Sequence, residues 1–155
     1  MQLLSPNFEN QKDINRKFTC DGENVSPALK WSGVPGGAKS LALIVDDPDA
    51  PDPANPRMTW VHWILYNIPV TISSLPEGVK DTDLPKGTSQ GVNDWKKIGY
   101  GGPCPPIGTH RYFHKLYALD TVLTDLTSPT KKRLEEAMEG HILSKAELVG
   151  LYKRS

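Results

Sequence analysis

The chain has 155 residues, and its 18 basic and 18 acidic side chains give a formal net charge of zero. One domain spanning residues 1–155 is expected at this length, which is sufficient for a hydrophobic core without disulfides. The balanced charge lacks the basic footprint of nucleic-acid binding, and no segment has the roughly 18 to 20 consecutive apolar residues of a membrane span. We therefore expect neither a nucleic-acid partner nor a transmembrane segment.

The N-terminus and the cysteines bear on the cellular location. MQLLSPNFENQ has no charged n-region and no apolar h-region, so we expect no secretory signal and a cytoplasmic protein. Cys20 and Cys104 are too few for a disulfide framework. One bridge between them is conceivable, but reduced thiols are the expectation in a cytosol.

Four segments have the patterns of β-strands: residues 40–46, 60–67, 110–120 and 146–152. Strict alternation in the second would place His62 on one face with Trp60, Ile64 and Tyr66, and Val61, Trp63 and Leu65 on the other.

One helix is also indicated after residue 127. Ser128 could cap it, Pro129 suits its first position and Gly140 could end it. An apolar stripe is formed by Leu134, Ala137 and Met138. Several strands, long loops and one clear helix favour a mostly β fold, an antiparallel sandwich with one or two short helices.

Two loops beside the strands have unusual compositions. Residues 45–53, VDDPDAPDP, contain four aspartates and three prolines, and His62 follows on the next strand. Residues 98–108, IGYGGPCPPIG, are rich in glycine and proline and precede His110. Glycine lets backbone amides approach a ligand closely, and successive amides can form an anion-binding nest.

If these loops meet in space, they would form a pocket containing Asp47 or Asp49, His62, His110 and Tyr112. Imidazole, phenol and amide groups can all donate hydrogen bonds, which suits a small anion such as phosphate. A carboxylate beside a histidine would orient its ring, and it could also meet the ammonium of a zwitterionic head group. The simpler alternative is that both loops are only turns, because Asp, Gly and Pro favour turns.

An enzymatic alternative remains open at this stage. Asp47 and His62 could form an acid–base pair of a hydrolase acting on a phosphorylated or ester substrate, with or without Cys104 as nucleophile. No serine lies in a GxSxG-type turn, and the acidic loop lacks the spacing of a calcium loop. A non-enzymatic binding protein without catalytic residues, metal or cofactor is the preferred hypothesis.

The motifs in this order resemble the phosphatidylethanolamine-binding protein family, in its prokaryotic Raf-kinase-inhibitor-like branch. The resemblance covers nearly the whole chain. The matching pieces are TCDGENVSPALKW, LALIVDDPDAP, WVHW, GYGGPCPP, HRYFHKLYALD and GHILSKAELVGLY.

This resemblance implies a β-sandwich with a small pocket for phosphate-type groups, including phosphoethanolamine head groups. The implied ligand-binding residues are Asp47, His62, Gly102, Pro105, Pro106, His110 and Tyr112. It also implies a cis bond between Ala50 and Pro51. The expected partners are a small anionic or phosphorylated ligand and, as in kinase-inhibiting relatives, a protein kinase or another protein. A homodimer is compatible with a small sandwich that has exposed apolar loops.

Overall fold

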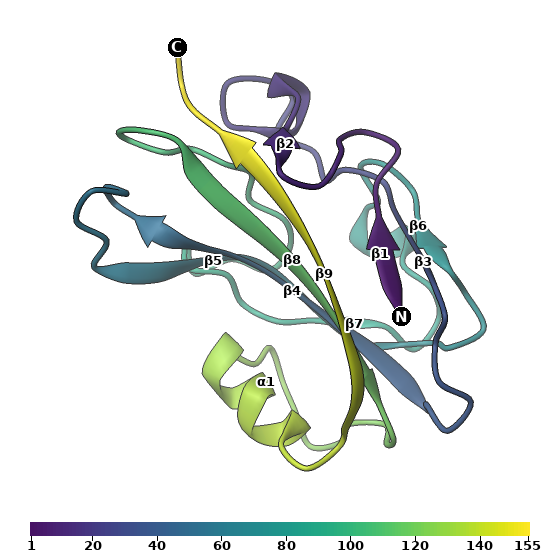
Figure 1. Ribbon diagram of the computed structural model, residues 1–155. Helices are drawn as coiled ribbons and strands as arrows, with labels where there is room; N and C mark the ends of the chain where they lie inside the picture. Colours follow the sequence, from purple (N-terminus) through teal and green to yellow (C-terminus); the bar gives the residue numbers. More distant parts are fainter.

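The computed structural model describes residues 1–155, and β-strands dominate it (Figure 1). The strands are β1 (Gln2–Leu4), β2 (Lys12–Asp13), β3 (Leu29–Ser32), β4 (Ser40–Ala50), β5 (Met58–Ile68), β6 (Ser74–Leu75), β7 (Ser89–Gln90), β8 (His110–Leu119) and β9 (Ile142–Tyr152). The helices are the 3-10 turns η1 (Arg16–Phe18) and η2 (Asp81–Asp83) and the α-helix α1 (Lys131–Met138). None of them is long and apolar enough to cross a membrane. The predicted mostly β fold is confirmed.

The strands form two sheets. Six strands pair in the order β2-β9-β8-β4-β5-β7, and three pair in the order β1-β3-β6. Every pairing is antiparallel except that of β2 with β9. All four predicted strands are present, and the first continues beyond residue 46 to Ala50.

Two apolar cores cover the two faces of the large sheet. Leu3, Trp31 and Leu75 of the small sheet pack with Leu43 and Leu116 of the large one. On the opposite face lies α1, visible in Figure 1 on the other side of the large sheet from β1 and β3. Burial of both faces explains why the central strands β4 and β5 consist almost entirely of apolar residues along their middle.

The start of α1 differs from the prediction. Thr130, not Ser128, is the N-cap, and its hydroxyl accepts a hydrogen bond from the Arg133 amide. Ser128 has φ of 43° and lies in the preceding turn. Pro129 therefore precedes the N-cap instead of occupying the first helical position. Threonine can accept a hydrogen bond from an amide of the first helical turn as well as serine can. The sequence alone could therefore not show which of Ser128 and Thr130 is the N-cap. Gly140 follows the helix end with φ of 81°, as predicted.

A β-bulge changes the predicted faces of β5. Val45 pairs with Trp63 and Asp46 pairs with Val61, which leaves His62 without a partner on β4. The extra residue turns His62 to the same side as Trp63, and Val61 instead packs in the α1 core. Strict alternation was therefore wrong at this position.

The cysteines also differ from the expectation of free thiols. Cys20 and Cys104 form a disulfide across 84 residues of chain, with Cα atoms 5.4 Å apart. The bridge joins the segment after η1 to the glycine-rich loop before β8. Disulfides are more typical of oxidising compartments, so the cytoplasmic location stays a prediction and this bridge counts against it.

Candidate functional site

The aspartate-rich and glycine-rich loops meet around one cavity of about 350 Å³. Six of the seven residues predicted for the site line it: Asp47, His62, Pro105, Pro106, His110 and Tyr112. The remaining lining residues are Ala50, Pro51, Met58, Trp60, Trp95 and Cys104. The peptide bond between Ala50 and Pro51 is cis, as the family resemblance implied.

Gly102 is the predicted site residue that does not line this cavity. Its amide donates a hydrogen bond to Asn24 Oδ1 at 2.8 Å, and a Cβ at this position would lie 2.3 Å from the Phe18 carbonyl oxygen. The Gly101 amide is likewise occupied, because it donates to the His62 carbonyl. These two amides hold the loop in place rather than forming the expected anion nest.

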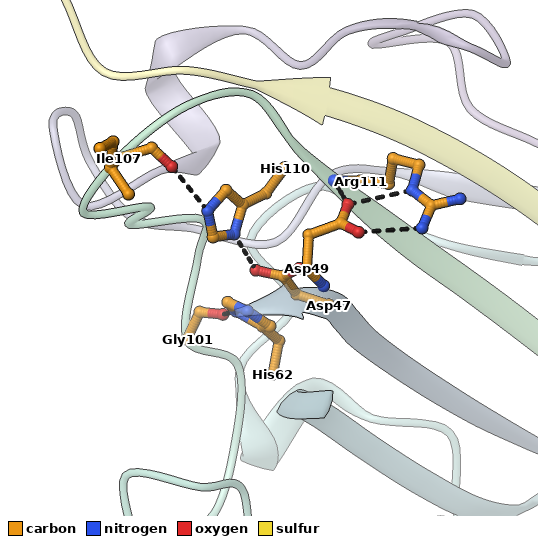
Figure 2. Close-up of polar contacts among 7 residues, drawn as sticks. All are labelled: Asp47, Asp49, His62, Gly101, Ile107, His110 and Arg111. Carbon is orange, nitrogen blue, oxygen red and sulfur yellow. Dashed lines mark hydrogen bonds and ion pairs between the residues drawn. The ribbon is translucent and has the colours of Figure 1, made fainter. Parts of the chain in front are cut away.

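The four aspartates of residues 45–53 have separate roles. Asp46 faces α1, where its Oδ2 lies 3.1 Å from Lys115 Nζ and 2.7 Å from Lys131 Nζ. Asp49 lies in a second irregularity of β4 between residues 47 and 50, is buried, and forms a bidentate pair with Arg111 (Figure 2). Asp52 accepts a bond from the Ala54 amide in the exposed turn. Asp47 alone lines the cavity.

Asp47 orients His110 rather than His62. Its Oδ2 lies 2.6 Å from His110 Nδ1, and its Oδ1 accepts a bond from the Asp49 amide at 2.7 Å. Burial raises the pKa of the Asp47 carboxyl, and the bonds from His110 and the Asp49 amide oppose this shift. His110 Nε2 donates to the Ile107 carbonyl at 2.9 Å, so both ring nitrogens already have partners (Figure 2).

His62 is held differently. Its Nδ1 donates to the Gly101 carbonyl at 2.7 Å, which leaves Nε2 without a hydrogen-bond partner from the protein. Burial lowers the pKa of His62 to about 4, so the ring is neutral at pH 7 and its Nε2 is an acceptor. The Asp47–His62 acid–base pair considered from the sequence is not formed.

Tyr112 supplies a second polar atom without a partner. The residue is 1% exposed, and its hydroxyl has no hydrogen-bond partner in the protein. Burial raises the pKa of this phenol, which therefore keeps its proton. The ring centroids of Tyr112 and His62 are 5.2 Å apart, so one small ligand could contact both.

Trp95 was missed from the sequence, although it forms one wall of the cavity. Its ring lies edge-on to Trp60 and His62, with centroids 5.5 and 5.0 Å away. The preceding Asp94 binds the backbone of Val61 on β5, which positions the loop. A Cβ on Gly101 would lie 2.3 Å from the Trp95 ring, so glycine is required there. A tryptophan in an irregular loop has no periodic pattern that would reveal this contact.

The Asp47–His110 contact leads to a first prediction. The Asp47→Ala change is expected to lower the free energy of unfolding by about 3 kcal/mol, because it leaves a buried imidazole nitrogen and the Asp49 amide without their partner. Urea unfolding measures this change. Asp49→Ala is the matched control, with an expected loss of about 1 kcal/mol because its partner Arg111 has a half-exposed side chain. Equal losses in the two variants would contradict a structural role for the Asp47–His110 pair.

The chain is a β-sandwich protein with a cavity lined by residues of the two loops, and comparison with known proteins identifies its family. The family model described as phosphatidylethanolamine-binding protein matches residues 4–153. The chain belongs to the phosphatidylethanolamine-binding protein family.

Three relatives from bacteria and archaea match over nearly their full lengths. A UPF0098 protein of Methanothermobacter thermautotrophicus is 53% identical, with 99% of each chain covered. A crystal structure from Chlamydia trachomatis, described as a phosphatidylethanolamine-binding protein homolog, is 45% identical with a TM-score of 0.90, covering 99% of this chain and 97% of that one. Escherichia coli YbcL is 34% identical with a TM-score of 0.89, covering 99% and 98%.

Proposed function

We propose that this protein binds the phosphate-type group of a small ligand in the cavity beside Asp47. The ligand would be a phosphoethanolamine-like head group or another phosphorylated molecule, and binding needs no catalytic residue. Family membership supports a ligand-binding role, and the cavity volume of about 350 Å³ suits a small molecule.

The buried Tyr112 hydroxyl carries this proposal. A buried hydroxyl without a partner costs roughly 1 to 3 kcal/mol, so its presence in a cavity wall is explained if a ligand supplies the missing bond. A phosphate oxygen accepts hydrogen bonds strongly and would supply it.

The ammonium group of a phosphoethanolamine-like head group also has a candidate partner in the cavity. Asp47 is the only carboxylate that lines the cavity, and each of its oxygens retains a further lone pair. The aromatic rings of Trp60 and Trp95 stand nearby, and aromatic faces attract ammonium groups. Both features favour a ligand that bears a positive charge beside its phosphate.

No observation favours the hydrolase alternative. His62 binds Gly101 instead of Asp47, and the sulfur of Cys104 is occupied in the disulfide. A kinase-inhibitor-like regulatory role rests on the sequence resemblance and stays a prediction.

An NMR titration with phosphoethanolamine, with inorganic phosphate for comparison, tests the proposal. We expect saturable shifts at His62 and Tyr112 in the wild-type protein. The Tyr112→Phe change is expected to weaken binding about tenfold, since it deletes one hydrogen bond to a charged group. It should leave the free energy of unfolding unchanged or raised, because the hydroxyl has no partner within the protein.

The matched control is Tyr117→Phe. Tyr117 is on the same strand and is also buried, but it faces the α1 core. This control should bind as the wild type does. Equal affinity of the Tyr112→Phe variant and the wild-type protein, or the absence of shifts at His62 and Tyr112, would overturn the assignment of the cavity.

A further inference from the structure

We propose that the groove between α1 and the start of β9 is a second binding site, which takes a small alkyl diamine or polyamine. The groove has a volume of about 430 Å³ and shares no lining residue with the cavity beside Asp47. Side chains from β8, from α1 and from the start of β9 line it. It lies beside α1, at the end of the molecule opposite the C-terminus (Figure 1).

The rim of the groove carries negative charge that the protein leaves unpaired. Glu135, Glu136 and Glu139 contribute three exposed carboxylates, and Lys132 contributes the single ammonium group. None of these four side chains forms an ion pair within the protein. Because Glu135 and Glu139 are about one helical turn apart, two ammonium groups of one ligand could each meet a carboxylate.

The charges of α1 are arranged against the helix dipole. The helix begins with Lys131, Lys132 and Arg133 and has no acidic residue in its first turn, whereas its last turn has glutamates and no basic residue. Each of these placements lowers helix stability, because anions are favoured at the N-terminus and cations at the C-terminus. Lys131 is accounted for by its ion pair with Asp46. A bound cation would compensate both the glutamates and the negative end of the helix.

A buried tyrosine hydroxyl without a partner opens into the same groove. Tyr117 is 8% exposed and lines the groove, and its hydroxyl makes no hydrogen bond within the protein. The hydroxyls of Tyr66, Tyr100 and Tyr152 each donate one. The Tyr117 hydroxyl is not fully enclosed, in contrast to that of Tyr112, so a ligand in the groove can reach it.

The surroundings of this hydroxyl suit an ammonium group on a methylene chain. Burial raises the pKa of Tyr117 to about 12 and the Glu135 carboxylate adds to the shift, so the neutral phenol oxygen can accept a hydrogen bond from an ammonium group. Lys145 Nζ already lies 5.6 Å from the ring centroid, which shows that a cation is tolerated beside this ring. Met138 and Ile142 add apolar surface for methylene groups. A hydrated metal ion would make no use of that surface.

NMR titrations of the wild-type protein with putrescine, butylammonium and Mg²⁺ at low ionic strength test the proposal. We expect putrescine to shift the amide signals of α1 and of the start of β9 saturably. Butylammonium has the same chain with one ammonium group and should bind about threefold to fivefold more weakly. Mg²⁺ has the same charge without the chain and should also bind more weakly than putrescine. Added salt should weaken all three.

Two pairs of variants separate this site from general charge effects and from the first cavity. Tyr117→Phe should lower putrescine affinity about tenfold and leave phosphoethanolamine binding unchanged, whereas Tyr112→Phe should do the reverse. Glu135→Gln should lower putrescine affinity about threefold. Its matched control, Glu9→Gln, replaces an exposed glutamate that does not line the groove and should have no effect.

Three results would overturn the proposal. Butylammonium or Mg²⁺ binding as tightly as putrescine would show an ordinary solvated helix face. Unchanged putrescine affinity in Tyr117→Phe would remove the hydroxyl from the site. Equal losses in Glu135→Gln and Glu9→Gln would mean that putrescine responds only to the net charge of the protein.

Discussion

Lowering the pH from about 6.5 to about 4 is expected to destabilise the folded protein by up to about 6 kcal/mol, because it must protonate two buried histidines. Burial lowers the pKa of both His62 and His114 from 6.5 to about 4. A group whose pKa is lower in the folded state contributes stability that is fully present above its unfolded pKa and is lost as the pH falls. Each shift corresponds to about 3 kcal/mol, which is a large part of the total for a small domain.

Asp47 acts in the opposite direction. Its raised pKa favours the protonated carboxyl in the folded protein, so its contribution to stability increases as the pH falls. One carboxyl can offset only part of the loss from two histidines. We therefore expect a net fall in the free energy of unfolding across this range.

Urea unfolding at pH 7, 5.5 and 4.5 measures the effect. The His114→Gln change should remove about half of the loss, since the amide can still donate to the Tyr112 carbonyl that His114 Nδ1 contacts. His141→Gln is the matched control, because this histidine is exposed and its replacement leaves both buried histidines in place. A His114→Gln variant that loses as much stability in acid as the wild type would contradict this account.

The sequence predicted the main strands because both faces of the large sheet are buried. This burial explains the apolar runs and the alternating patterns in residues 40–46, 60–67 and 110–120. The bulge at His62 could not be predicted from the sequence, because it depends on how β5 pairs with β4 and not on the chemistry of His62 itself.

The sequence predicted most of the residues that line the cavity, but it did not predict the contacts between them. The two loops meet with Asp47, His110 and Tyr112 around one cavity, but the sequence could not show that Asp47 binds His110 and that His62 binds the Gly101 carbonyl. These hydrogen bonds depend on the exact positions of the side chains. The bulges and the close packing of Gly101 against Trp95 determine those positions.

The expectation of free thiols at Cys20 and Cys104 was wrong, because the formation of the bridge depends on how close the two cysteines lie in space. η1 and the glycine-rich loop are brought together by bonds unrelated to sulfur, including Tyr100 Oη to the Phe18 carbonyl and the Cys20 amide to the Pro103 carbonyl. Two cysteines 84 residues apart give no sign of this proximity.

Replacing both cysteines, Cys20→Ser with Cys104→Ser, is expected to lower the free energy of unfolding by about 4 kcal/mol. A cross-link across 84 residues restricts the unfolded chain strongly, and its stabilisation grows with the length of the closed loop. Ligand affinity should fall as well, because Cys104 lines the cavity beside Pro105 and Pro106. Urea unfolding measures the first effect, and titration with phosphoethanolamine the second.

A dithiol reductant provides the matched control, since it breaks the bridge without changing the sequence. It should bring the stability of the wild-type protein close to that of the double variant and leave the variant itself unchanged. The noncovalent bonds between η1 and the loop remain in both cases, so the folded protein should keep its cavity with a more mobile wall. Equal stability of oxidised wild type and variant would mean that these bonds alone fix the loop, and that the bridge adds nothing to the fold.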